Sequence, residues 1–132
     1  LLYSSEERRR IVGPGGDMLA QNFRCLEYLF MAFGRMRGAA CFILTFREFH
    51  TAEGRFLFSY FESVLRSVLS GASSVQQIDK NRLAVFASVN DVDRVRKTAA
   101  RWNDVHGNLG VARFDSGADL NYNGFLNNYI FQ

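Results

Sequence analysis

Apolar residues in the first third of the chain recur at helical spacing. From residue 17 to about residue 37 they return at intervals of four, three, four and three positions, the pattern of a helix with one face toward a core. The residues of this stripe are Leu19, Phe23, Leu26, Phe30 and Phe33. We therefore predict a helix over residues 17–37, capped at its start by Asp17 after the Gly-rich break at 13–16.

The same helix carries more apolar residues than one core face needs. Those outside the stripe are Tyr28, Leu29, Met31 and Met36. Deep burial of the helix is the simpler interpretation, and a surface for a second protein is the alternative. The excess makes this helix the candidate interface of the chain. We assign to that interface Leu19, Phe23, Tyr28, Phe30 and Met31.

The middle of the chain switches between strand and helix patterns. Residues 39–46, AACFILTF, are a short continuous apolar run, which predicts a strand buried on both faces. Residues 53–69 return to helical spacing and end before Gly71. Residues 73–89, SSVQQIDKNRLAVFASV, contain two apolar stretches around a polar tetrapeptide, which predicts a hairpin with its turn at residues 79–82.

The last third of the chain repeats this alternation. Asn90 is the expected N-cap of a helix, with Asp91 and Asp93 near its positive end. Residues 109–114 predict another strand, and a helix is expected from about 118 to 130. Asparagine and glycine inside that last segment make it a weak helix former, so packing would have to hold it.

This order of elements predicts an α+β fold. Strands interleaved with helices and one central hairpin are typical of a sandwich of ferredoxin-like or nucleotide-cyclase palm type, with a central, mostly antiparallel sheet flanked by helices. A chain of 132 residues, 48% hydrophobic and with one proline, suits a single globular domain. We assign residues 1–16 to a linker or N-terminal extension and residues 17–132 to the domain.

The charge and the cysteine and histidine content limit the kinds of partner and ligand that the chain is expected to bind. The net charge of +3 is scattered along the chain, whereas nucleic-acid binding needs a clustered basic face. Cys25 and Cys41 are isolated among apolar residues, which predicts buried reduced thiols and favours the cytoplasm. His50 and His106 have no spacing typical of a metal or nucleophile site, so we expect no metal and no cofactor. No apolar run approaches the roughly 20 residues that cross a bilayer, and we expect no membrane span in this segment.

Four strings in this order resemble the GGDEF domain of diguanylate cyclases, from about residue 17 to the end. FILTFREF at 42–49 is similar to the family's first core strand, and FSYFESVLRSVL at 58–69 to the helix that follows it. VQQIDKNRLAVF at 75–86 stands in the place of the signature hairpin, and LGVARFDSGADL at 109–120 is similar to a late strand and turn. The resemblance implies a palm-like fold and a setting in bacterial cyclic di-GMP signalling, such as biofilm or exopolysaccharide regulation.

The residues that carry the family's chemistry are replaced. Thr45 and Arg47 stand where the family has acidic residues. Asp79-Lys80-Asn81-Arg82 replaces Gly-Gly-Asp-Glu, whose glycines let the backbone approach the nucleotide and whose acids hold metal. Residues 70–73, SGAS, stand where the family has the Arg-x-x-Asp site for its product. The resemblance thus implies a degenerate domain, a pseudoenzyme without the metal-binding carboxylates.

Two functions fit these replacements. One is a catalytically inactive regulatory domain that acts by protein contact or dimerisation, as the cytoplasmic part of a larger or membrane-attached protein. The other is a receptor that binds GTP or cyclic di-GMP without turnover, with cations replacing metal at the phosphates. The candidate phosphate contacts are Arg47, Arg55, Lys80 and Arg82. A nucleotidyl enzyme of altered chemistry would need a metal site that these patterns do not contain.

Overall fold

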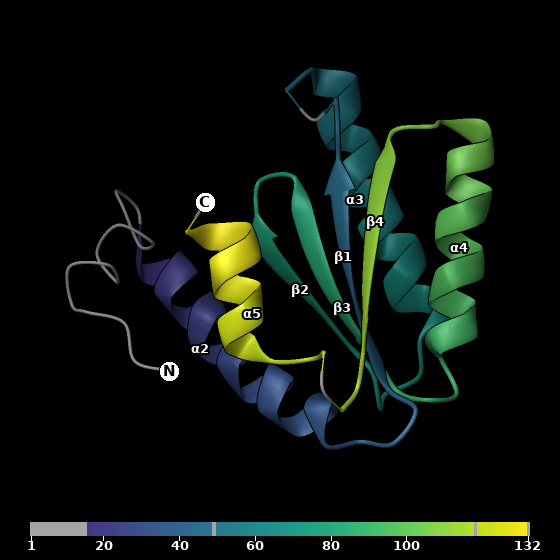
Figure 1. Cartoon of the computed structure of the whole chain (residues 1–132). Coiled ribbons are helices and arrows are strands. Elements are labelled where there is room, and N and C mark those ends of the chain that lie inside the picture. Colours follow the sequence, from purple (N-terminus) through teal and green to yellow (C-terminus); the bar gives the residue numbers. More distant parts are fainter. Residues whose placement is uncertain (1–15, 49, 118, 132) are drawn as a thin grey trace.

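The computed structural model describes residues 16–48, 50–117 and 119–131, with side chains from residue 24 onward (Figure 1). Its helices and strands follow one another in the predicted order. They are α2 (Gly16–Gly34), β1 (Ala40–Phe46), α3 (Ala52–Val68), β2 (Ser74–Asp79), β3 (Arg82–Ala87), α4 (Val92–Val105), β4 (Leu109–Asp115), α5 (Tyr122–Phe125) and the π-helical turn η1 (Leu126–Ile130). The predicted linker at 1–16 lies outside the described residues, apart from Gly16, which begins α2. Because α2 begins at Gly16, Asp17 lies inside the helix, and the prediction that Asp17 is its N-cap is wrong.

The strands form a sheet in the order β2-β3-β1-β4, and every neighbouring pair is antiparallel. Leu44 in the central strand β1 pairs with Leu83 of β3 on one side and with Val111 of β4 on the other. The connections through α3 and α4 each pass one intervening strand, the split βαβ arrangement of ferredoxin-like folds. The predicted α+β class, with an antiparallel sheet between helices, is confirmed.

Each face of the sheet has its own core. Successive side chains of a strand point to opposite faces, so Phe42, Leu44 and Phe46 face α3 and α4, whereas Cys41 and Ile43 face α2, α5 and η1. Figure 1 shows the resulting three layers. The helical residues that close the two cores are Phe58, Phe61, Leu65, Val95, Ala99 and Trp102 on the first face, and Leu26, Phe30, Phe33, Tyr122, Phe125 and Leu126 on the second. Burial on both faces explains the continuous apolar run at 39–46, and that strand prediction is confirmed.

The helix α2 ends earlier than predicted. It stops at Gly34 instead of continuing to residue 37, and the chain turns through Gly38, whose φ is +78°. Glycine adopts this left-handed conformation without the strain that a side chain would cause. A Cβ at Gly38 would also lie 2.7 Å from Cγ2 of Val89, so the turn passes close to the segment between β3 and α4.

The last helix is shorter and less regular than predicted. Instead of beginning near residue 118, α5 begins after Asn121, whose Oδ1 accepts a hydrogen bond of 2.6 Å from the Gly124 N–H. This cap defines the start of the helix. The chain then widens into the π-helical turn η1, closed by a bond of 2.9 Å from the Phe131 N–H to the Leu126 carbonyl. Weak helix formers in this segment are consistent with the irregular turn.

Two smaller predictions are wrong. Cys41 is buried in β1 as expected, but Cys25 is exposed on α2. The N-cap position of α4 is occupied by Asp91 rather than Asn90, and the Asp91 side chain does not cap the helix. In the part of the chain that the structure describes, no helix combines the length and hydropathy needed to cross a membrane.

Candidate functional site

The turn between β2 and β3 lies where the sequence places the degenerate signature, and Asp79 closes it. The Asn81 N–H donates to Asp79 Oδ1 at 3.1 Å. Arg82 donates to Asp79 Oδ2 through Nε at 2.9 Å and through Nη2 at 2.6 Å. An aspartate that binds a backbone N–H two residues later stabilises a turn, so a polar tetrapeptide here has a structural role.

Arg82 also contacts the helical layer formed by α2, α5 and η1. Its remaining guanidinium nitrogen, Nη1, donates to the Tyr129 carbonyl in η1 at 3.0 Å. The Arg82 side chain is 19% exposed and that of Asp79 is 34% exposed. All three guanidinium nitrogens therefore have protein partners, and the Asp79 carboxylate neutralises the charge. Desolvation raises the pKa of the Tyr129 hydroxyl.

Asn81 joins the hairpin turn to the end of β1. Its Nδ2 donates to the Phe46 carbonyl at 3.0 Å, and its own carbonyl accepts from the Phe46 N–H at 2.8 Å. On the other side of β1, the Arg47 N–H donates to the Asn108 carbonyl at 3.0 Å. Hydrogen bonds thus join the turn, the end of β1 and the start of β4 at one end of the sheet (Figure 1).

Thr45 and Arg47, at the positions where the resemblance expects carboxylates, lie at this end of the sheet. Thr45 pairs with Arg82 of β3 and with Gly110 of β4. A Cβ at Gly110 would lie 3.9 Å from Nη2 of Arg47, so the Arg47 side chain passes over β4. Among the described residues, no group of three or more histidine, cysteine, aspartate or glutamate side chains could hold a metal ion.

The four candidate phosphate contacts lie at the same end of the sheet but are not equivalent. Arg82 is engaged as described, and Arg55 in the first turn of α3 donates from Nη1 to the His50 carbonyl at 2.9 Å. Arg47 is exposed at the end of β1, and Lys80 is exposed in the turn. Arg55 and Arg82 therefore stabilise this end of the sheet, and the four cations together are poorly arranged to bind a phosphate.

A second polar cluster, which the sequence patterns did not predict, lies at the opposite end of the sheet. Asp91 is fully buried, and its Oδ2 accepts hydrogen bonds from the Ser70 N–H at 3.0 Å, from the Ser70 hydroxyl at 2.6 Å and from the Ser73 hydroxyl. Its Oδ1 accepts from Arg94 Nη1 at 3.1 Å. The cluster ties the loop after α3 to the start of α4. The serine-rich string at 70–74 was the available signal, although its partner lies 21 positions from Ser70.

Two opposite effects act on the pKa of the Asp91 carboxyl in this cluster. Burial by itself raises the pKa of the Asp91 carboxyl, but the hydrogen bonds from Ser70 and Ser73 and the nearby Arg94 outweigh that effect, so the pKa is lowered. The carboxylate is therefore the form that the folded protein stabilises. Its hydrogen bonds hold the loop after α3 against the start of α4, which gives the cluster a structural role.

The predicted interface on α2 divides into two sets. Tyr28 and Met31 are 69% and 54% exposed, whereas Phe30 is 3% exposed and packs in the core. Assignment of Phe30 to the interface is wrong, because its ring contacts Phe86 with centroids 4.9 Å apart and edge-to-face geometry. The side chains of Leu19 and Phe23 lie outside the described residues. A partner could therefore contact Tyr28 and Met31 without disturbing the core.

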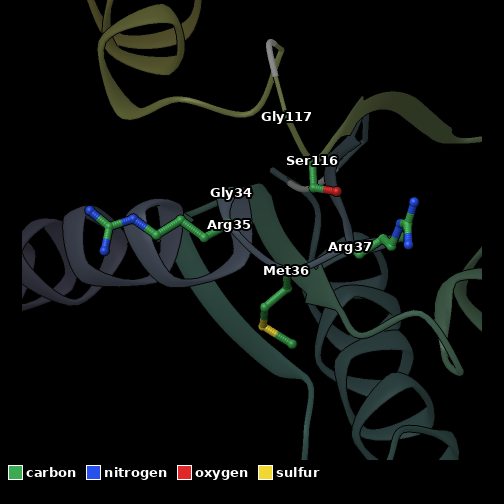
Figure 2. Close-up of a pocket in the computed structure, with 7 residues that line it drawn as sticks. Gly34, Arg35, Met36, Arg37, Ser116 and Gly117 are labelled. Carbon is green, nitrogen blue, oxygen red and sulfur yellow. The ribbon is translucent and has the colours of Figure 1, made fainter.

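A shallow, open hollow of about 360 Å³ lies at the end of α2. Its lining is Gly34, Arg35, Met36, Arg37, Gly38, Ser116 and Gly117. Figure 2 shows that the Arg35 and Arg37 side chains point away from one another, Arg35 back along α2. The hollow is therefore not a two-arginine clamp for an anion.

Comparison with known proteins gives no match: no family model, no curated protein and no solved structure matches the chain. Its possible functions must therefore be argued from its own residues, namely the closed hairpin turn, the buried Asp91 cluster and the exposed side chains of α2.

Proposed function

We propose that this chain is a catalytically inactive GGDEF-like regulatory domain that acts by protein contact. The observation that carries the proposal is the closed turn at the end of the hairpin. A metal-dependent cyclase needs acidic oxygens there, free to coordinate a cation. Here Asp79 binds Arg82, and Arg82 also binds the Tyr129 carbonyl, so the turn is part of the internal structure.

The topology supports the comparison with that family. The hairpin turn lies against the end of β1, through the pair of bonds between Asn81 and Phe46. The resemblance requires this proximity, because one metal site would draw ligands from both segments. The residues at the required positions, Thr45 and Arg47, lack carboxylates.

Protein contact is supported by the outer side of α2. Tyr28 and Met31 are large apolar side chains with more than half of their surface exposed. Side chains of this kind lose water when a partner covers them, and aromatic and methionine residues are enriched in interfaces. A cytoplasmic setting in cyclic di-GMP-type signalling, as part of a larger protein, remains part of the proposal and comes from the resemblance alone.

The receptor alternative has less support. It needs cations free to bind phosphate, but Arg82 and Arg55 already donate to protein oxygens. Asp79 and the exposed Glu48 also lie at the same end of the sheet as Arg47 and Lys80, and their negative charge disfavours a phosphate there. We therefore place regulation by protein contact first.

The proposal is tested with nucleotides. The folded protein is incubated with GTP and Mg²⁺ or Mn²⁺, and products are separated by chromatography, with the Asp79→Ala variant as the matched control. We expect no product from either protein. Turnover that disappears in Asp79→Ala would refute the pseudoenzyme assignment.

Binding without turnover is measured separately by titration calorimetry with GTP and with cyclic di-GMP. We expect no heat beyond dilution with either nucleotide. Saturable heat that is lost in Arg47→Ala and kept in Arg101→Ala, an exposed cation on α4, would favour the receptor alternative instead.

A further inference from the structure

The side of α2 that faces away from the core carries both apolar and basic residues. Leu26, Phe30 and Phe33 face the sheet. At 3.6 residues per turn, Arg24, Tyr28 and Met31 lie within an arc of about 60° on nearly the opposite side. Arg35 follows in the turn after the helix, and its side chain lies back along α2 in Figure 2. These four residues, Arg24, Tyr28, Met31 and Arg35, form what we term the outer stripe of α2.

The outer stripe is apolar in the middle and positive at both ends. All four side chains are exposed, and neither arginine has an ion pair with a described residue. Between residues 24 and 38 there are three arginines and one acidic residue, Glu27. Arg24 lies roughly 15 Å along the helix from Gly34, the last residue of α2, and Arg35 is the next residue.

The spacing of the stripe argues against a second copy of the chain as its partner. The intervals between its four residues are four, three and four, so the stripe reads the same in both directions. If two copies paired through it as antiparallel helices, Arg24 would lie opposite Arg35 of the partner copy. If they paired as parallel helices, each arginine would lie opposite itself. Both arrangements place like charges together, which disfavours pairing.

The same spacing fits a helix with acidic ends. We propose that the outer stripe of α2 is a docking surface for an acidic amphipathic helix of another protein, with the pattern Glu-x-x-x-Leu-x-x-Leu-x-x-x-Glu or its aspartate equivalent. The two apolar residues of such a helix would cover Tyr28 and Met31, and each carboxylate would meet an arginine. Arginine binds carboxylates through two parallel hydrogen bonds, which adds specificity to charge.

A membrane surface fits this stripe less well. Helices that lie on membranes carry a broad apolar face and several lysines or arginines. The outer stripe has two apolar residues and two arginines, and the exposed Glu27 lies beside it. The inference rests on the proposed function, since it names the chemistry of the partner in protein contact.

The test uses two synthetic helical peptides of about 18 residues, long enough to form a helix. One has the acidic pattern above, and the other has the same leucines with both glutamates replaced by lysine. Binding to the whole chain is followed by fluorescence anisotropy of a label on each peptide. We expect the acidic peptide to bind at least about tenfold more tightly than the basic one.

Variants make the test specific. The double variant Arg24→Glu with Arg35→Glu should reverse the preference, so that the basic peptide binds more tightly. The double variant Tyr28→Ser with Met31→Ser should weaken both peptides about tenfold or more. Lys97→Glu with Arg101→Glu, on the exposed side of α4, changes the net charge equally and should leave the preference intact. Circular dichroism melting verifies that every variant is folded.

Three results would overturn the inference. The first is acidic-peptide binding that Arg24→Glu with Arg35→Glu leaves unchanged, or no binding at all by the folded chain. The second is binding to vesicles of phosphatidylcholine and phosphatidylserine, but not to the peptide, through the same residues. The third is a dimer in sedimentation that Tyr28→Ser with Met31→Ser dissociates. Nucleotide turnover would instead refute the pseudoenzyme assignment, so the two failures are distinguishable.

Discussion

The two ends of the sheet hold their acidic residues in opposite ways. At the hairpin end, Asp79 is 34% exposed and binds one arginine, whose side chain is 19% exposed. At the other end, Asp91 is fully buried and accepts hydrogen bonds from three serines as well as Arg94. Water can replace much of what Asp79 loses when its partner is removed. It does not reach the Asp91 carboxylate itself, although Ser70 and Arg94 around it are exposed. The hairpin end is therefore expected to matter less for stability.

The largest expected effect is the loss of the buried carboxylate. Asp91→Ala leaves the Ser70 N–H and the serine hydroxyls without their acceptor, so we expect the free energy of unfolding to fall by about 2–4 kcal/mol. Asp79→Ala should lower it by about 1 kcal/mol or less, because that pair is partly exposed. Urea unfolding followed by Trp102 fluorescence measures both. Equal losses in the two variants would contradict the comparison.

The pH dependence of stability should also originate at the Asp91 end. The pKa of Asp91 is lowered in the folded state, so below its unfolded value of about 3.9 the unfolded chain binds more protons at this site. Its contribution to stability is complete above that pH and is lost as the pH falls through the folded pKa. We expect the urea midpoint of the wild type to fall more steeply between about pH 5 and pH 2 than that of Asp91→Asn. Parallel curves would show that other carboxylates dominate.

An intermediate effect is expected from the arginine of the hairpin. Arg82→Met removes its bonds to Asp79 and to the Tyr129 carbonyl but keeps most of the apolar stem, and should cost about 1–2 kcal/mol. The loss should concentrate in η1, which would exchange its amide hydrogens faster in hydrogen-exchange mass spectrometry. Arg47→Met, at the same end of the sheet, is the matched control and should leave η1 unchanged. Uniform loss of protection across the sheet would contradict a local role.

The smallest effect is expected at Asp93, which separates a lowered pKa from a contribution to stability. Hydrogen bonds from Lys97 and Arg96 lower the pKa of Asp93 to about 2. Its side chain is 59% exposed, and those of Arg96 and Lys97 are each 56% exposed, so solvent screens the interaction. We expect no measurable change in the urea midpoint for Asp93→Ala in 1 M salt. A loss comparable with Asp91→Ala would show that burial is not the deciding factor.

Local periodicity was sufficient to predict the helices, the strands and the antiparallel sheet. A strand buried on both faces, such as residues 39–46, has a continuous run of apolar residues that the sequence shows directly. Local periodicity was insufficient for contacts that the topology creates. Asp91 meets Ser70 and Ser73 only because the loop after α3 and the start of α4 lie at the same end of the sheet. Likewise, Arg82 and Tyr129 are 47 positions apart, and no short motif links them.

The error at Phe30 has a different origin. The interface prediction combined a member of the buried stripe with Tyr28 and Met31, which lie on the other side of the same helix. Projection of the sequence around a helix separates these sets, because residues 26, 30 and 33 share one side. The irregular end of the chain was harder to predict, since both the Asn121 cap and the π-helical turn depend on local hydrogen bonds.

The central position of β1 has a consequence for the way the chain folds. Its neighbours on both sides are strands that occur much later in the sequence, as the pairs of Leu44 with Leu83 and with Val111 show. The hairpin of β2 and β3 can form from neighbouring residues. Pairing of β1, in contrast, requires β3 and β4, which are distant in the sequence, and long-range pairing slows folding. During synthesis the apolar string 39–46 would emerge long before β4 could cover its second edge. The strand that later anchors both cores is thus exposed to aggregation before the fold is complete.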